Sequence, residues 1–192
     1  IINLELIMAD LQTVENRLAK VERKAQTNKD KDAMAEVAVL KKIKDALEAE
    51  KPARSVELDK DELAIVKAFS LLTLKPVIYV ANMSEDDFNG KLDSNPFYNE
   101  VLQIAREENS EVVPICARLE EEIADMSKED KMMFLEELGL KESGLDRLIK
   151  AGYHLLGLIS YLTAGKPEVR AWTITRGTKA PQAAGKIHSD FE

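Results

Sequence analysis

The segment KPVIYVANMSEDDF, residues 75–88, changes from apolar to acidic within a few positions. An apolar run, residues 77–81, follows Pro76 and stops at Asn82, after which the sequence becomes polar and acidic. A short apolar run bounded by proline and asparagine predicts a buried β-strand. The pattern raises the question of why a buried strand should end on an asparagine, with Glu85 three residues later.

A second short apolar run, residues 112–116, follows a segment of helical spacing that opens at Pro96. Strand, helix and strand in close succession are typical of a βαβ unit with parallel strands. Ligands of such sheets bind just beyond the carboxyl ends of the strands. Asn82, Cys116 and Ala117 occupy that position, so we expect a binding site there.

Two helices are expected before this unit. Apolar residues recur every three or four positions over residues 4–25, which predicts a long helix with an a/d seam. A polar link at residues 27–32 precedes a second apolar stripe from Met34 to Leu47, and Pro52 follows it. The pattern predicts an antiparallel helical hairpin with a basic tip at residues 24–31.

Further elements are expected after the hairpin and after the βαβ unit. Residues 59–62 resemble a capping box, which opens a helix that carries Phe69 and Leu72. Ser127 and Ser143 each suit the N-cap of a helix. Residues 158–163 and 169–175 alternate like the strands of a β-hairpin.

Composition narrows the class of protein. The chain has 192 residues, of which 45% are hydrophobic and 32% charged, enough for one core or two small domains. A net charge of −8 argues against a basic nucleic-acid binder as a whole. The single cysteine, Cys116, excludes an intramolecular disulfide framework and fits a reducing compartment. No apolar run approaches the roughly 18 residues of a membrane span, so no membrane is expected as a partner.

Charge is unevenly spread. Residues 17–31 hold six Lys or Arg against two acids, residues 100–146 hold fourteen acids against five bases, and residues 166–186 hold five bases against one acid. The two basic patches suit a partner such as RNA, despite the net charge. Most charge runs are simply solvated faces, and that interpretation stays open for each patch.

The familiar catalytic and metal motifs are absent from the sequence: GxxxxGK[ST], CxxC, HExxH and GxSxG do not occur. His154 and His188 have no ligand-spaced companions and are expected to be structural or exposed. Cys116 has no obvious base beside it and is expected to be a buried small residue. The glutamate runs 107–108 and 120–122 are expected to be solvated. The chain therefore lacks a complete active site, and no metal site is expected.

The tetrapeptide Asn82-Met83-Ser84-Glu85 suits the reading of a nucleobase. An asparagine side chain carries two donors and an acceptor in one plane, whereas an ionised carboxylate only accepts. Guanine-specific proteins typically place Asn-Lys-x-Asp at this position. Methionine in place of lysine, and the longer glutamate in place of aspartate, favour adenine.

Several stretches resemble the YchF/EngD subfamily of Obg-related P-loop NTPases, the Obg-like ATPases. They are residues 3–15, 82–85, 114–120 and, most specifically, 170–188, and the resemblance covers essentially the whole chain. It implies an α/β fold: a partial P-loop NTPase-type parallel sheet, an inserted antiparallel helical hairpin (coiled coil) and the start of a β-grasp TGS domain. Residues 1–10 would end the first half of the nucleotide domain, 11–75 would form the hairpin, 76–152 the second half with base recognition, and 153–192 a truncated TGS domain.

The resemblance also implies a set of nucleotide-binding residues. Asn82 would bond adenine through its side chain and Met83 through its backbone. Glu85 takes the place that aspartate holds in guanine readers, and Cys116 and Ala117 match a Ser-Ala backbone motif that supports the base. The phosphate loop, the Mg²⁺ ligands and the catalytic residues would precede this chain, which should not hydrolyse ATP alone.

Members of this family hydrolyse ATP, and many accept GTP; they associate with ribosomes in the cytoplasm. The resemblance thus implies ATP with Mg²⁺ as the ligand, GTP as a possible one, and the ribosome or RNA as partner. Arg23, Lys24, Lys29 and Lys31 at the hairpin tip are the candidate RNA contacts. Two alternatives remain: a GTP-dependent nucleic-acid-binding protein, and a helical interaction module without nucleotide turnover.

Overall fold

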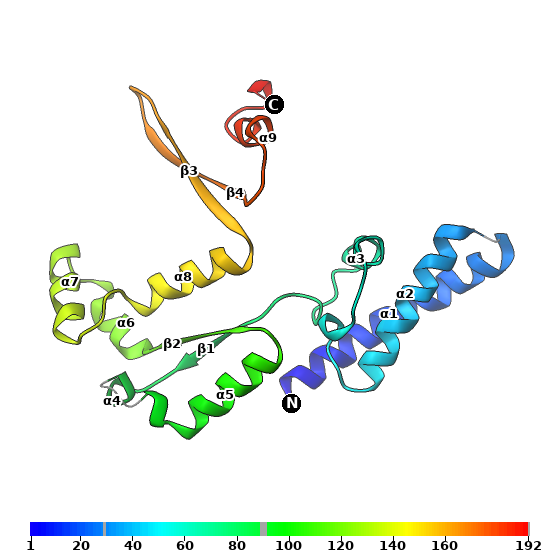
Figure 1. The fold of residues 1–192 in the computed structure, drawn as a ribbon, viewed down its shortest axis with the longest axis horizontal. Helices are drawn as coiled ribbons and strands as arrows, with labels where there is room; N and C mark the ends of the chain where they lie inside the picture. Colours follow the sequence, from blue (N-terminus) through cyan, green and yellow to red (C-terminus); the bar gives the residue numbers. More distant parts are fainter. Residues whose placement is uncertain (29, 89–91, 192) are drawn as a thin grey trace. The chain divides into compact units, whose positions relative to one another are not determined.

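The computed structural model describes residues 1–28, 30–88 and 92–191, except for the side chains of residues 26–28. The chain divides into two compact units, Ile1–Pro76 and Val77–Glu192 (Figure 1). Within the described ranges, no helix is both long enough and apolar enough to cross a membrane.

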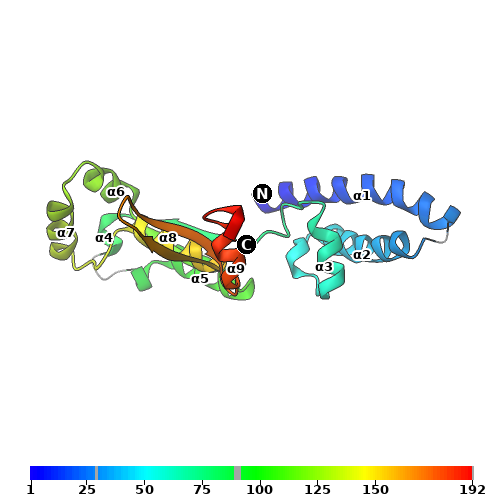
Figure 2. The same ribbon diagram turned by 90° about the horizontal axis from the view of Figure 1, so that it is seen from above.

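The first unit is built on the expected helical hairpin. Helix α1 (Ile2–Asn28) and helix α2 (Lys31–Glu48) lie side by side (Figures 1 and 2). Asp30 caps α2 by accepting hydrogen bonds from the backbone N–H groups of Asp32 and Ala33. The apolar seam between the helices is buried, and its members include Ile7, Val14, Leu18, Leu40, Ile43 and Leu47.

Two seam residues lie elsewhere than expected. Met34 is 56% exposed, and Ala33 is buried instead, because Ala33 lies one heptad before Leu40 and so shares its face of the helix. Leu4 is also exposed. Helix α1 has 27 residues and α2 only 18, so the first turns of α1 extend beyond the end of α2.

The rest of the first unit closes against the hairpin. Helix α3 (Lys60–Lys67) begins with the predicted capping box of Asp59 and Glu62. It ends earlier than expected, so Phe69 and Leu72 lie beyond it, where Ser70 adopts a positive φ of 52°. A short 3-10 helix, Ala53–Ser55, lies between α2 and α3.

The second unit contains the predicted parallel strand pair, β1 (Ile78–Asn82) and β2 (Glu111–Ile115). Helix α5 (Pro96–Glu107) joins them, after α4 (Glu85–Phe88) and a 3-10 turn at Leu92–Ser94. Helices α6 (Ala117–Ala124), α7 (Lys128–Glu137) and α8 (Gly144–Leu155) follow β2. Ser127 and Ser143 are the N-caps of α7 and α8, as predicted. Helices α5 and α8 lie on opposite sides of the sheet (Figure 1), so helices cover both faces, as in other parallel sheets.

The end of the second unit is the predicted β-hairpin, β3 (Leu158–Ala164) and β4 (Val169–Thr175), paired antiparallel. Helix α9 (Ala180–Gly185) and a 3-10 turn at Ser189–Phe191 follow. The Tyr161 hydroxyl donates to the Ala183 carbonyl at 2.6 Å, which ties α9 to the hairpin.

The mixed α/β class, the long helical hairpin and the two small sheets agree with the expectation. The finer assignments to a P-loop NTPase-type sheet and a β-grasp domain stay predictions, as does the division into four domains. Residues 1–10 belong to the same continuous helix α1 as the hairpin.

Candidate functional site

Asn82 is the last residue of β1 and stands beside Ile115, the last residue of β2. Its side-chain Oδ1 accepts a hydrogen bond from the backbone N–H of Ala117 at 3.0 Å. Two positions that the sequence singled out, 35 residues apart, are therefore bonded directly across the ends of the two strands. Because Oδ1 is engaged, the side-chain amide nitrogen of Asn82 is left as a donor.

Met83 continues the strand pairing by one residue. Its backbone N–H donates to the Ile115 carbonyl at 2.7 Å, so that N–H is not available to a ligand. Among the residues that the structure describes, none is shown donating to the Met83 carbonyl. The backbone of Met83 can therefore offer a ligand an acceptor and no donor.

A cavity of about 290 Å³ lies at this end of the strands. Four of the five predicted nucleotide-binding residues line this cavity. The fifth, Ala117, does not line it but donates a hydrogen bond to Asn82. The lining consists of Asn82, Met83, Ser84, Glu85, Asp86, Cys116 and Arg118.

Arg118 is one of three lining residues, with Ser84 and Asp86, that the sequence did not predict as nucleotide-binding residues. Its Nε lies 3.3 Å from Glu85 Oε1 and 3.3 Å from Glu122 Oε1, and only the contact with Glu122 has hydrogen-bond geometry. Glu85 Oε1 is thus a buried acceptor that has an ion-pair neighbour but no hydrogen bond from the described residues. The spacing of Arg118 and Glu122, four residues apart on a helix, predicts that the two side chains pair, and it was the only sequence signal that pointed to Arg118.

The loop after β1 is held by its own side chains. Asp87 Oδ2 accepts from the backbone N–H of Ser84 at 3.2 Å and from the Ser84 hydroxyl at 2.6 Å. Asp87 Oδ1 accepts from the side-chain amide of Asn95, the N-cap of α5. These bonds fix the turn that carries Glu85 to the cavity.

The remaining candidates lie as follows. Cys116 is buried, as expected, and it is the N-cap of α6 without a side-chain bond to that helix. The side chains of His154 and His188 are 80% and 61% exposed, in line with the expectation. The expectation that Glu120 is solvated is wrong, because its carboxylate accepts from the backbone N–H groups of Gly144 and Leu145. In the described ranges, no group of three or more His, Cys, Asp or Glu is placed to hold a metal ion.

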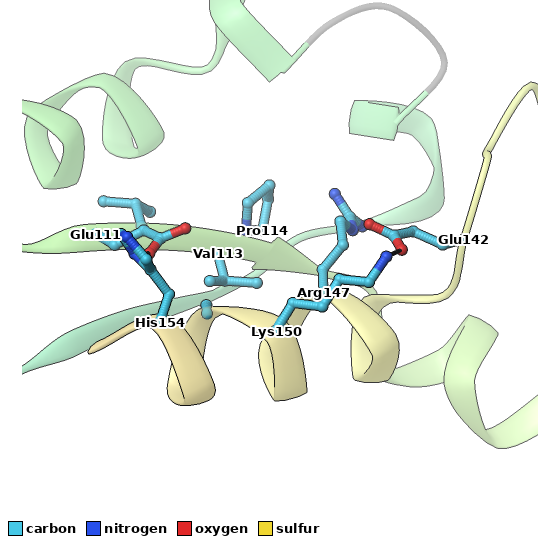
Figure 3. Close-up of a pocket in the computed structure, with 9 residues that line it drawn as sticks. Glu111, Val113, Pro114, Glu142, Arg147, Lys150 and His154 are labelled. Atoms are coloured by element: carbon cyan, nitrogen blue, oxygen red, sulfur yellow. Dashed lines mark hydrogen bonds and ion pairs between the residues drawn. The ribbon is translucent and has the colours of Figure 1, made fainter. Parts of the chain in front are cut away.

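A second cavity of about 300 Å³ lies between β2 and α8 (Figure 3). Lys150 forms an ion pair with Glu142 at its rim. The Arg147 guanidinium lies 5.6 Å from the centre of the Phe88 ring, and His154 lies 4.0 Å from Glu111. Two carboxylates and two Arg or Lys side chains line this groove. It therefore lacks the excess positive charge of an anion site.

The hairpin tip carries the candidate RNA contacts. Arg23, Lys24 and Lys31 are exposed, whereas Lys29 lies outside the described residues. A cavity of about 340 Å³ near the tip is lined by both signs of charge: Arg17, Lys20 and Lys24 face Asp30, Asp32 and Glu36. Arg17 is ion-paired with Glu36, so the tip is less uniformly basic than the sequence suggested.

Known proteins resemble this chain over its whole length. A family model named YchF-GTPase_C, described as a protein of unknown function (DUF933), matches residues 158–192. The "Ribosome-binding ATPase YchF" of Bacillus subtilis is 55% identical over 195 residues, and that of Escherichia coli O157:H7 is 50% identical over 192. Each alignment covers 100% of this chain and 52% of the relative.

A solved structure resembles this chain as well. The structure of the Schizosaccharomyces pombe YchF GTPase superposes with a TM-score of 0.89 at 35% identity, covering 100% of this chain and 52% of that one. The chain thus spans about half the length of the relatives it matches.

Proposed function

Because the chain belongs to the YchF family, we propose that it is the base-recognition part of a ribosome-associated ATPase, and that the base it reads is adenine. The bacterial relatives are named as ribosome-binding ATPases. The observation that carries the proposal is the bond from Ala117 N–H to Asn82 Oδ1 at the mouth of a cavity.

The choice of adenine rests on the donors and acceptors that remain free. The Met83 carbonyl accepts from the exocyclic amine of adenine, and the Asn82 side-chain amide donates to a ring nitrogen. Guanine carries a carbonyl where adenine carries that amine. The Met83 N–H, which would serve a carbonyl, already donates to Ile115. An unpaired acceptor facing the guanine carbonyl costs about 1–3 kcal/mol.

A second candidate base is guanine, and one observation favours it. Glu85 lines the cavity, and no described residue donates a hydrogen bond to its Oε1. Guanine offers a ring N–H and an amine to a carboxylate. The Schizosaccharomyces pombe relative is described as a GTPase. The two bases therefore make opposite predictions about the role of Glu85.

The phosphates and Mg²⁺ belong elsewhere in this proposal. Mg²⁺ prefers oxygen ligands and is commonly held by substrate phosphates together with one or two carboxylates. The described residues supply no phosphate-binding loop of the GxxxxGK[ST] type. Hydrolysis of ATP is thus proposed for a longer protein that contains this chain. We place that protein in the cytoplasm, with the ribosome as partner through Arg23, Lys24, Lys29 and Lys31.

Base recognition can be tested on this chain directly by nuclear magnetic resonance. The ¹⁵N-labelled chain is titrated with ATP and, separately, with GTP to millimolar concentrations, because without phosphate contacts the affinity is low. We expect ATP to shift the Asn82 side-chain amide and the backbone amides of Met83 and Ala117, and GTP to shift them less. Asn82→Ala should abolish these shifts, whereas Asn3→Ala, at an exposed asparagine of the first unit, should not.

Two outcomes would contradict the proposal. Larger shifts with GTP at the same residues would assign the site to guanine. If neither ATP nor GTP shifts these resonances, the chain does not read a base, and the alternative of a helical interaction module is favoured.

A further inference from the structure

We propose that Glu120 is the positioning residue for the turn formed by Cys116 and Ala117, which it holds by tying helix α6 to the N-terminus of helix α8. The inference rests on the proposed function, since that turn is where the base would be supported. Glu120 belongs to a glutamate run that was expected to be solvated. In the structure its carboxylate accepts hydrogen bonds from the backbone of α8.

Glu120 lies in the first turn of helix α6, four residues after Cys116. Its own backbone N–H donates to the Cys116 carbonyl at 3.0 Å. Helix α6 has no side-chain cap, because Cys116 forms none. The polar contacts that hold the start of α6 are the Asn82 bond to Ala117, the ion pair of Arg118 with Glu85, and the bonds of the Glu120 carboxylate to α8.

The Glu120 carboxylate binds the first turn of α8. Oε1 accepts from the Gly144 N–H at 2.6 Å, and Oε2 accepts from the Leu145 N–H at 3.3 Å. Unsatisfied N–H groups at a helix start favour a negative charge, and charge-assisted bonds are stronger than neutral ones. Ser143 caps the same helix through a different N–H, that of Asp146, so the two caps do not duplicate each other.

The backbone at this contact is built to allow the close approach of Glu120. Gly144 is buried, and a Cβ atom there would lie 3.0 Å from Glu120 Oε1 and 3.0 Å from Ile115 Cγ2. Ile115 also provides the carbonyl that binds the Met83 N–H. The contact of Glu120 with α8 thus packs directly against the residue that holds the other half of the site.

Glu121 provides a matched control. It is the same residue type at the next position of the same helix, it is exposed, and no described residue is shown binding its carboxylate. Glu120→Ala and Glu121→Ala therefore change helix propensity and net charge equally. Only the first removes the bond to α8.

The test is amide hydrogen exchange of the nucleotide-free chain, measured at Ala117 relative to the buried Val113 of β2. We expect Glu120→Ala to speed exchange at Ala117 by about tenfold or more, as befits the loss of a hydrogen bond to a charged group. Glu121→Ala should leave the rate within about twofold. Glu120→Gln, which keeps an oxygen acceptor, should restore part of the protection.

The overturning result is faster exchange at Gly144 and Leu145 with Ala117 unchanged, since Glu120 would then only cap α8. Because no nucleotide is present, this result is independent of the proposed function. ATP titrations of the same variants follow: if Glu120 positions the turn, Glu120→Ala weakens the ATP-induced shifts several-fold. If the unsubstituted chain shows no such shifts, the proposed function fails, and the exchange rates still decide the role of Glu120.

Discussion

The Asp10 carboxylate, buried in helix α1, accepts two hydrogen bonds from Thr73, which lies 63 residues later. Asp10 Oδ2 receives the Thr73 backbone N–H and the Thr73 hydroxyl, each at 2.7 Å, and Oδ1 receives the Leu72 N–H at 2.8 Å. The Thr73 hydroxyl oxygen in turn accepts from the Ala53 N–H at 2.9 Å. One acid thus ties the segment after α3 to the hairpin.

Asp10→Ala is expected to destabilise the first unit strongly. The substitution leaves two backbone N–H groups and a hydroxyl without their acceptor in a buried place, and each such group costs about 1–3 kcal/mol. We expect a loss of about 3 kcal/mol or more, measured as a shift of the urea midpoint. Glu5→Ala in the same helix, at an exposed acid, should change stability by less than about 0.5 kcal/mol. Equal effects of the two substitutions would contradict this account.

Asn82→Asp is expected to separate the two tasks of the Asn82 side chain. Aspartate keeps an oxygen that accepts from Ala117 N–H, but it replaces the amide donor by a second acceptor. The Ala117 amide should stay protected from exchange, whereas ATP-induced shifts should fall at least about tenfold. Asn82→Ala should lose both. Retention of ATP binding in Asn82→Asp would show that the amide does not contact the base.

Features that depend on neighbouring residues could be predicted from the sequence, whereas features that depend on distant residues could not. The strand that ends at Asn82 was predictable because an apolar run and its bounding residues act over a few positions. The use of the Met83 N–H was not, since it depends on the register with β2. Glu120 was expected to be solvated, and Asp10 was not singled out. Their partners lie 24 and 63 residues away, beyond any local pattern.

Acid should loosen the start of helix α8. The Ser143 hydroxyl donates to the Asp146 carboxylate and holds the pKa of Asp146 below its ordinary value. Because the folded-state pKa lies below the unfolded one, this stabilisation is complete above the unfolded pKa of about 3.9 and is lost as pH falls through the folded pKa. The protection of the Asp146 and Arg147 amides, measured as the exchange rate relative to the intrinsic rate at the same pH, should therefore fall below about pH 4.

The acid effect has a specific control. Ser143→Ala removes the hydroxyl, so the Asp146 pKa should return toward its ordinary value and the acid-dependent part of the exchange should shrink. The carboxyl ¹³C resonance of Asp146 reports the pKa directly. A resonance that titrates identically with and without the hydroxyl would rule out this cause.

Charge reversal at the hairpin tip tests the ribosome as partner. Lys24 and Lys31 are both exposed at the tip, and each phosphate contact contributes about 0.7–0.9 to the slope of log affinity against log salt. Lys24→Glu with Lys31→Glu should therefore weaken ribosome binding and flatten that slope by about 1.4–1.8. The measurement is co-sedimentation with ribosomes at several salt concentrations. Lys51→Glu with Lys60→Glu makes the same change of charge at exposed positions away from the tip of the same unit and should leave the slope unchanged. If both pairs weaken binding equally, the effect follows net charge, and the hairpin tip is not the contact.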